Sequence, residues 1–298
     1  MHQIVTDTLY TLLVSALNGL NALPPRLAYG LGERLGDLMY AALASRRRVT
    51  LENLALALGE YQSPYERHAM AREVFRNLGR HVVDFAHLRR INVARIQQMC
   101  VNWEDVTRLD ALATRGQGLL VISAHFGSWE LLSAITLLLQ TPVNVIVRPP
   151  DNPLVSRLSE AYRQRCGYRA IGRREQAMRE SLRALRRQEI VAVLMDQSSV
   201  RSEAVEVAFF GIKTFTPMGP ALLTLRARCP VVGVFLVREA LGRHRVVITD
   251  EIPIARTGKV QRDVEENSRR FNRIIEAQIR RYPAQWFWLH RRWKKRPL

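Results

Sequence analysis

GLLVISAHFGSWE, from Gly118 to Glu130, is the stretch that decides the fold of this chain. Its apolar run at residues 119–122 predicts a short buried strand. A turn of small residues follows His125, and the apolar run at residues 129–139 is long enough for a helix. A strand followed by a helix places His125 at the carboxyl end of the strand, where α/β sheets bind their ligands.

The same alternation of strand and helix patterns continues towards the C-terminus. Apolar runs typical of strands lie at residues 119–123, 143–147, 190–195, 231–237 and 245–252. Helical patterns separate the first four runs, which favours an α/β fold with a mostly parallel sheet and crossover helices. The last two runs flank a short loop around Gly242 and are expected to pair antiparallel, followed by a long helix at residues 260–281.

Three of these strands end in a polar residue: His125, Arg148 and Asp196. Because parallel strands end at the same edge of a sheet, we expect the three side chains to converge there. Glu130 lies five residues beyond His125 across a turn, so its carboxylate can fold back and fix the tautomer of the ring. The other ring nitrogen would then act as a general base. The start of the next helix, with Gly127 and Ser128, is a candidate anion site.

Two of these residues keep alternative roles. Arg148 would hold an oxyanion or a substrate phosphate, or would instead form a salt bridge that braces Glu130. For Asp196, ordering of the loop is favoured over direct contact with substrate. The sequence contains no GxSxG, HExxH or GxxxxGK[ST] motif, so direct attack by an acceptor hydroxyl is the simplest reaction scheme.

The chain is strongly basic. It has 45 Lys and Arg residues against 27 Asp and Glu, a net charge of +18, which attracts nucleic acid, anionic membranes, phosphorylated substrates or acidic proteins. No nucleic-acid-binding module is recognisable, so a basic nucleic-acid-binding protein remains only as the alternative from another class. Three cysteines without a CxxC pair indicate a reducing compartment and neither disulfides nor a metal site.

The N-terminal region carries the signals of membrane attachment. Residues 4–23 are largely apolar but too polar for a confident spanning helix, so an interfacial helix fits at least as well. An amphipathic leucine pattern and the basic cluster at residues 46–48 follow, which suits a cytoplasmic membrane surface or a solvated turn equally. We therefore predict membrane-associated helices over residues 1–45 and an α/β domain over residues 46–298, with a helical lead-in at 46–98.

The segment HFGSWE resembles the HX4(D/E) motif of glycerolipid acyltransferases, in the Glu form of the late acyltransferases of lipid A biosynthesis. Further blocks match that family in the same order along the chain. They are RPPDNP at 148–153, DQ at 196–197, FFG at 209–211, TPMG at 216–219 and YPAQWFWLHRRWK at 282–294. Together these blocks are far more specific than the HX4E motif alone.

The resemblance implies transfer of an acyl chain from an acyl carrier protein, or from coenzyme A, to a hydroxyl of a phosphorylated glycolipid. His125 would be the general base and Glu130 its partner. Substrate-binding roles would fall to Gly127, Ser128, Arg148, Asp196, Arg291 and Arg292, the last two at phosphates. No metal and no cofactor besides the acyl donor is implied.

The resemblance leaves the acceptor open. Residues 167–173 depart from the sequence that lipid A enzymes carry there, so the acceptor would be a lipid A precursor or, alternatively, a lysophospholipid or phosphatidylinositol mannoside. The expected partners are the glycolipid, an acidic carrier protein and the anionic surface of the inner membrane, with the active site on its cytoplasmic face. The His125/Glu130 pair argues against a non-catalytic membrane scaffold.

Overall fold

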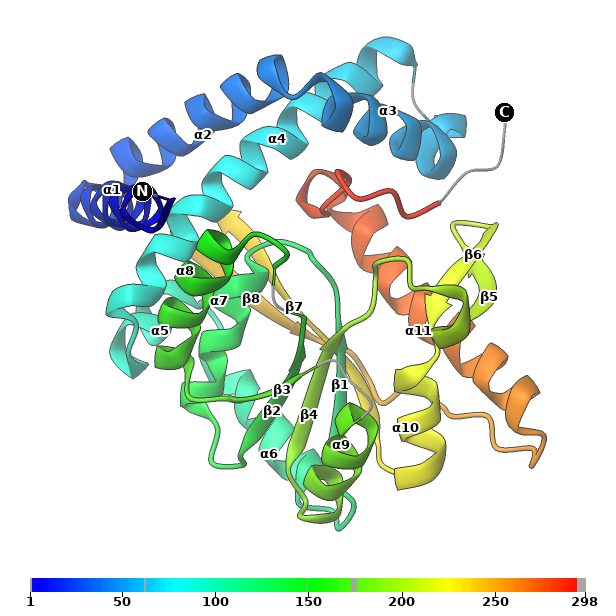
Figure 1. The fold of residues 1–298 in the computed structure, drawn as a ribbon. Coiled ribbons are helices and arrows are strands. Elements are labelled where there is room, and N and C mark those ends of the chain that lie inside the picture. The colour runs from blue at the N-terminus through cyan, green and yellow to red at the C-terminus, as the bar shows by residue number, and fades with distance from the viewer. Residues whose placement is uncertain (1, 62, 149, 173–175, 294–298) are drawn as a thin grey trace.

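A six-stranded sheet lies at the centre of the computed structural model, which describes residues 2–61, 63–148, 150–172 and 176–293 (Figure 1). The strand order is β3-β2-β4-β1-β7-β8. The bounds are β1 Leu119–Ser123, β2 Val143–Val147, β3 Arg169–Gly172, β4 Ile190–Leu194, β7 Val231–Ala240 and β8 Arg243–Ile248. The first five strands in this order pair in parallel, and β8 pairs antiparallel with β7. The predicted α/β class with a mostly parallel sheet is therefore confirmed.

Some elements were not predicted from the sequence. β3 is an edge strand in which only Ile171 is buried, so it has no apolar run. A separate hairpin joins β5 (Ala204–Phe209) to β6 (Ile212–Pro217). Its two turn residues, Phe210 and Gly211, both have positive φ, as a tight hairpin turn requires.

The helix predicted at residues 129–139 is also different in the structure. It consists of one α-helical turn, α7 (Trp129–Leu132), and the 3-10 helix η4 (Ser133–Leu138). The hydroxyls of Ser133 and Thr136 donate to backbone carbonyl groups three residues earlier. Such side-chain bonds compete with regular helical pairing.

The first four helices of the chain cover one end of the molecule (Figure 1). They are α1 His2–Ala22, α2 Pro25–Ala42, α3 Ala44–Leu58 and α4 Pro64–His87. Ser63 and Glu66 form a capping box at the start of α4, where the sequence predicts a helix to begin. α2 lies directly on α4, because a Cβ atom added at Gly79 would lie 1.8 Å from the carbonyl oxygen of Gly32.

The remaining helices flank the sheet on its two faces. They are α5 Val93–Met99, α6 Arg108–Ala113, α8 Pro153–Arg163, α9 Gln176–Arg186, α10 Gly219–Ala227 and α11 Val260–Arg281. Leu120 and Ile122 of β1 belong to the core shared with α9, α10 and α11. Leu119 and Val121 belong to a second core, shared with α6 and η4. The alternation of side chains along β1 therefore separates two apolar cores.

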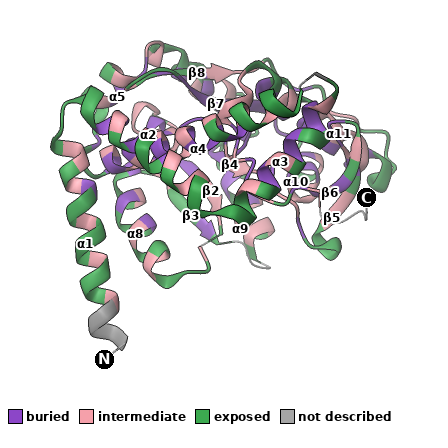
Figure 2. Cartoon of the chain, turned by 90° about the horizontal axis from the view of Figure 1, so that it is seen from above, coloured by how far each residue is buried: buried purple, intermediate pink, exposed green. Residues whose placement is uncertain are grey.

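The first two helices expose several leucines. Figure 2 shows α1 projecting from the body, with most of its described residues exposed. In α2 the leucines at every third or fourth position are exposed: Leu27, Leu31, Leu35 and Leu38. Within the described ranges, no helix combines the length and hydropathy needed to cross a membrane.

Candidate active site

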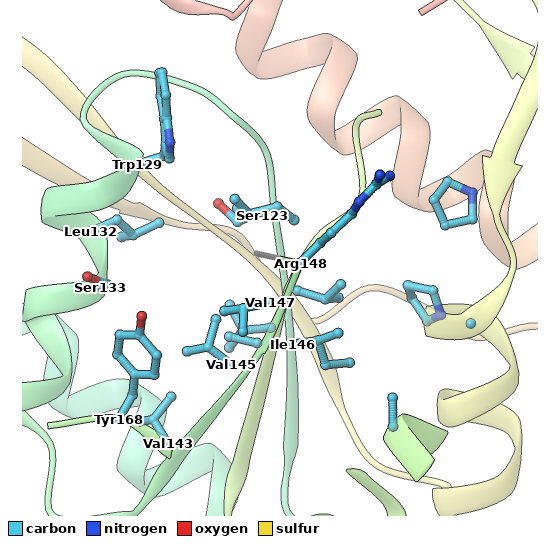
Figure 3. Close-up of a pocket in the computed structure, with 18 of the residues that line it drawn as sticks. Ser123, Trp129, Leu132, Ser133, Val143, Val145, Ile146, Val147, Arg148 and Tyr168 are labelled. Carbon is cyan, nitrogen blue, oxygen red and sulfur yellow. The ribbon is translucent and has the colours of Figure 1, made fainter. Parts of the chain in front are cut away.

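A cavity of about 1390 Å³ opens at the carboxyl ends of β1, β2 and β4. His125, Glu130 and Arg148 line it, together with side chains from both faces of the sheet. Figure 3 shows Leu132 and Tyr168 on the side of the cavity below Trp129, and the side chain of Arg148 extending away from them. Two of the residues predicted to converge, His125 and Arg148, thus line one cavity, and Asp196 contacts His125 directly.

The closest contact at the site joins His125 to Asp196. Nδ1 of His125 lies 2.8 Å from Oδ1 of Asp196, and the backbone N–H of His125 donates to Oδ2 at 3.1 Å. The indole N–H of Trp286 also donates to Oδ2, at 2.8 Å. Asp196 thus orders the loop, as the sequence favoured, and also takes the position at Nδ1 that was expected for Glu130.

The contact between His125 and Asp196 shifts the pKa of both groups. Burial by itself would lower the pKa of His125, but the Asp196 carboxylate outweighs burial and raises that pKa above its usual value. Burial would likewise raise the pKa of Asp196, whereas His125 and the N–H of Trp286 hold it below its usual range. With a proton on Nδ1 facing the carboxylate, Nε2 carries the lone pair that can accept a proton. The amide nitrogen of Gln197 lies 3.4 Å from Nε2.

Glu130 is paired with an arginine that the sequence did not single out. Arg163, at the end of α8, binds its carboxylate through two hydrogen bonds of 2.5 and 2.9 Å. Burial raises the pKa of Glu130, but Arg163 outweighs burial and keeps the carboxylate ionised. The alternative in which Arg148 braces Glu130 is therefore wrong, since Arg148 instead pairs with Asp151 at 3.2 Å.

Gly127 and Ser128 have structural contacts. The N–H groups of Gly127 and Ser128 donate to the carbonyl oxygens of Gln285 and Leu236. Gly127 has φ +57, and a Cβ atom there would lie 1.9 Å from the Leu236 oxygen. The Ser128 side chain is fully buried. Because these N–H groups already have acceptors, they are not available to bind the anion predicted at this turn.

The two arginines near the C-terminus differ in their surroundings. Arg291 is exposed, beside His290, which lines the cavity. Arg292 is fully buried and donates to Thr214, to the carbonyl of Phe215 and to Thr216 in β6. Burial lowers the pKa of Arg292 to about 10. The predicted phosphate contact of Arg292 has no accessible surface, so its role is to hold the C-terminal segment on the hairpin.

The C-terminal motif packs against the loop that carries His125 and also contacts α4. Phe126 forms a β-bridge with Trp286, and the N–H of Phe287 donates to the carbonyl of His125. Trp288 is fully buried, and its indole N–H donates to the carbonyl of Pro283. The aromatic pattern of this segment is thus explained by packing around the His125 loop. Its last residue, Lys294, lies outside the described residues.

Comparison with known proteins agrees with this geometry. Residues 3–295 match the family model of the bacterial lipid A biosynthesis acyltransferases. The chain belongs to this family. It is 30% identical over 273 residues to the lipid A biosynthesis palmitoleoyltransferase of Escherichia coli (strain K12), covering 90% of this chain and 85% of the relative.

More distant relatives cover even more of the chain. It is 26% identical over 284 residues to the lipid A biosynthesis lauroyltransferase of the same strain, covering 92% of this chain and 88% of the relative. It is 26% identical over 292 residues to a lipid A biosynthesis acyltransferase of Haemophilus influenzae (strain ATCC 51907 / DSM 11121 / KW20 / Rd), covering 97% and 91%. The recognised family resemblance and the acyltransferase class are thus confirmed.

Proposed function

We propose that this acyltransferase moves a fatty acyl chain from an acyl thioester to a hydroxyl of a phosphorylated lipid A precursor, with His125 as the general base. The observation that carries the proposal is the bond between His125 and Asp196 at the mouth of a large cavity. A carboxylate on Nδ1 holds the imidazole in the tautomer whose Nε2 accepts a proton.

The reaction follows from this arrangement. Nε2 of His125 takes the proton of the acceptor hydroxyl while its oxygen attacks the thioester carbonyl. The C–O bond forms, the C–S bond breaks, and the leaving thiolate takes the proton back from His125. The tetrahedral intermediate carries an oxyanion, and Arg163, which is bound to Glu130 and lines the cavity, supplies a positive charge for it.

The side chains that line the cavity fall into two groups, each suited to one substrate. The first group, which we call the apolar arm, consists of residues of the core shared with α6 and η4: Leu109, Val121, Leu132, Ile135, Leu139, Val143, Val145 and Ala192. The second, the mixed arm, combines Met178, Met218 and Leu222 with polar residues: Arg148, Asp151, Gln176, Gln197 and Ser198. The apolar arm fits the acyl chain of the donor, and the mixed arm fits the phosphorylated acceptor.

Charge and exposure support a position on a membrane. The exposed leucines of α2 gain about 25 cal/mol for each Å² that they bury in lipid. Arg46, Arg47 and Arg48 follow in α3, and each basic residue near an anionic surface adds about 1 kcal/mol. We propose that residues 1–45 seat the enzyme on the cytoplasmic face of the inner membrane. The net charge of +18 also suits an acidic acyl carrier protein as donor.

The function is tested by offering the purified protein defined donors and acceptors. Acyl carrier protein thioesters and coenzyme A thioesters are each combined with a lipid A precursor, a lysophospholipid and a phosphatidylinositol mannoside, and products are identified by mass spectrometry. We expect a mass increase of one acyl chain on the lipid A precursor, absent with His125→Ala. Preferential acylation of another acceptor would show that the acceptor is not a lipid A precursor. No acylation of any acceptor would reject the proposed acyl transfer.

A further inference from the structure

The inner face of α4 carries an unusual row of polar side chains. Asn77, His81 and Asp84 lie at positions i, i+4 and i+7, so they share one face of the helix, and all three are buried. Burial of polar groups is unfavourable unless each is bound. All three make contacts with the loop that carries His125 or with the residues that hold this loop.

Asp84 is bound to the loop through Ser128. The hydroxyl of Ser128 donates to Oδ2 of Asp84, and Arg238 of β7 donates to the same oxygen and, at 2.8 Å, to the Ser128 hydroxyl. Oδ1 of Asp84 accepts from the hydroxyl of Tyr29, in α2, at 2.5 Å. Ser128 stands between His125 and Glu130 in the chain, so this cluster anchors the midpoint of the catalytic loop.

The other two side chains hold the loop on either side of that anchor. The ring of His81 stacks on Trp129 with centroids 3.5 Å apart, and Trp129 in turn contacts the ring of His125 edge-on at 5.8 Å. Asn77 accepts from Arg238 and donates to the carbonyl of Ala284 at 2.9 Å, next to the residue that binds the N–H of Gly127.

We propose that Asp84 and His81 are positioning residues for acyl transfer, and that Tyr29 ties α2 to the same loop through Asp84. This inference rests on the proposed function. Asp84, His81 and Tyr29 are not among the residues that line the cavity, so they act on the reaction only through Ser128 and Trp129. A buried charged pair such as Asp84–Arg238 contributes little net stability compared with apolar packing. Its location beside the catalytic loop is explained by the need to fix His125 and Glu130 relative to each other, since small displacements slow a reaction strongly.

The test uses two substitutions that keep the Asp84–Arg238 pair. Ser128→Ala removes the hydroxyl that links the loop to Asp84, and Tyr29→Phe removes only the hydroxyl that links α2 to Asp84. We expect kcat for acyl transfer to fall about 10- to 100-fold in Ser128→Ala and less in Tyr29→Phe, with little change in KM for either substrate. Because both bonds end on Asp84, the effects of the double variant on kcat should be non-additive.

A stability control separates positioning from a general loss of folding. Ile275→Val in α11 lowers stability at a buried position that is not part of the loop, so it should leave kcat unchanged. Thermal unfolding of every variant is measured beside kcat and KM. Wild-type kcat in Ser128→Ala, additive effects in the double variant, or an equal loss of kcat in Ile275→Val would each overturn the inference. If the wild-type protein transfers no acyl chain, the proposed function fails instead.

Discussion

The ring of His125 and the carboxylate of Asp196 lie 2.8 Å apart, although 71 residues separate them in the chain. The contact is possible because β1 and β4 are parallel neighbours in the sheet, with Ser123 opposite Leu194. The chain beyond each strand therefore starts from the same edge, and the two side chains meet two residues past the end of each strand. Substitution of either residue breaks this contact, so each residue can be tested separately.

The first prediction concerns the base. His125→Ala should lower kcat about 100- to 10,000-fold, because it removes the ring that Asp196 orients and whose Nε2 takes the proton of the hydroxyl. Purified protein is assayed by mass spectrometry and checked by circular dichroism. His68→Ala, in the exposed part of α4, is the matched control and should keep wild-type turnover. A folded His125→Ala protein with near-normal turnover would remove the assignment.

Asp196→Asn should change the pH dependence of the reaction. The Asp196 carboxylate raises the pKa of His125, and a general base works only when it is neutral. Without the carboxylate the pKa of His125 falls, so the acidic limb of the kcat profile should move to lower pH. The plateau should also fall, about 100-fold or more, because the ring loses its fixed tautomer. An unmoved acidic limb would mean that His125 titration does not control the rate.

Arg163→Ala should destabilise the protein by about 3 kcal/mol or more, because it leaves the Glu130 carboxylate partly buried without its partner. Arg157→Ala is the control from the same helix, since its ion pair with Asp7 is exposed, and it should cost much less. Urea unfolding of both variants gives the comparison. Adding Glu130→Gln to Arg163→Ala should recover part of the stability but not the activity. An equal loss of unfolding free energy in the two alanine variants would show that the Arg163–Glu130 pair stabilises the fold no more than an exposed ion pair does.

Arg148 should act on the acceptor and not on the fold. Its side chain is exposed, so Arg148→Lys should leave thermal unfolding unchanged while raising KM for the phosphorylated acceptor, because lysine cannot bind phosphate in a bidentate way. Asp151→Asn removes the carboxylate that competes for Arg148 and should lower the same KM. Steady-state kinetics at constant donor concentration measure both. Changes in the same direction for both variants would reject a phosphate contact.

The exposed leucines of α2 should bind the membrane. Leu31→Glu together with Leu38→Glu should reduce flotation with anionic vesicles, because both side chains are more than half exposed and contribute little to the fold. Point changes are cleaner than deletion of residues 1–45, since Gly32 of α2 lies directly on Gly79 of α4. Val260→Glu, equally exposed in α11, is the control and should float like wild type. Full flotation of the leucine variant would assign attachment to other residues.

The sequence was sufficient to predict a strand where both faces of the strand are covered by the core. β1 and β4 were found from continuous apolar runs, and β2 from a run that only Asn144 interrupts, because parallel strands between two layers of helices need apolar side chains. β3 has one buried residue, and the hairpin of β5 and β6 alternates weakly, so neither has a signal above that of a loop. Edge and accessory strands are stabilised by contacts with neighbouring strands, and the order of residues along the chain does not reveal these contacts.

The site was predictable in its location but not in its pairing. Strand ends located His125 and Asp196, and Glu130 followed from its place five residues beyond His125. Arg163 and Asp84, however, lie on helices about 40 residues from His125 in the chain. Only the tertiary structure distinguishes them from other charged helix residues, Asp84 by its burial and Arg163 by its pairing with Glu130. The burial of Arg292 was missed for the same reason, since basic residues in a row read as a solvent-facing surface.

The bond from Trp286 to Asp196 also sets an order of events during synthesis of the protein. Asp196 leaves the ribosome 90 residues before its indole partner, and His125 leaves earlier still. If the N-terminal helices bind the membrane as proposed, they can do so while the Asp196 carboxylate still lacks one of its hydrogen-bond donors. Acyl transfer should begin only when translation has passed the tryptophan, so that incomplete chains do not consume the acyl donor.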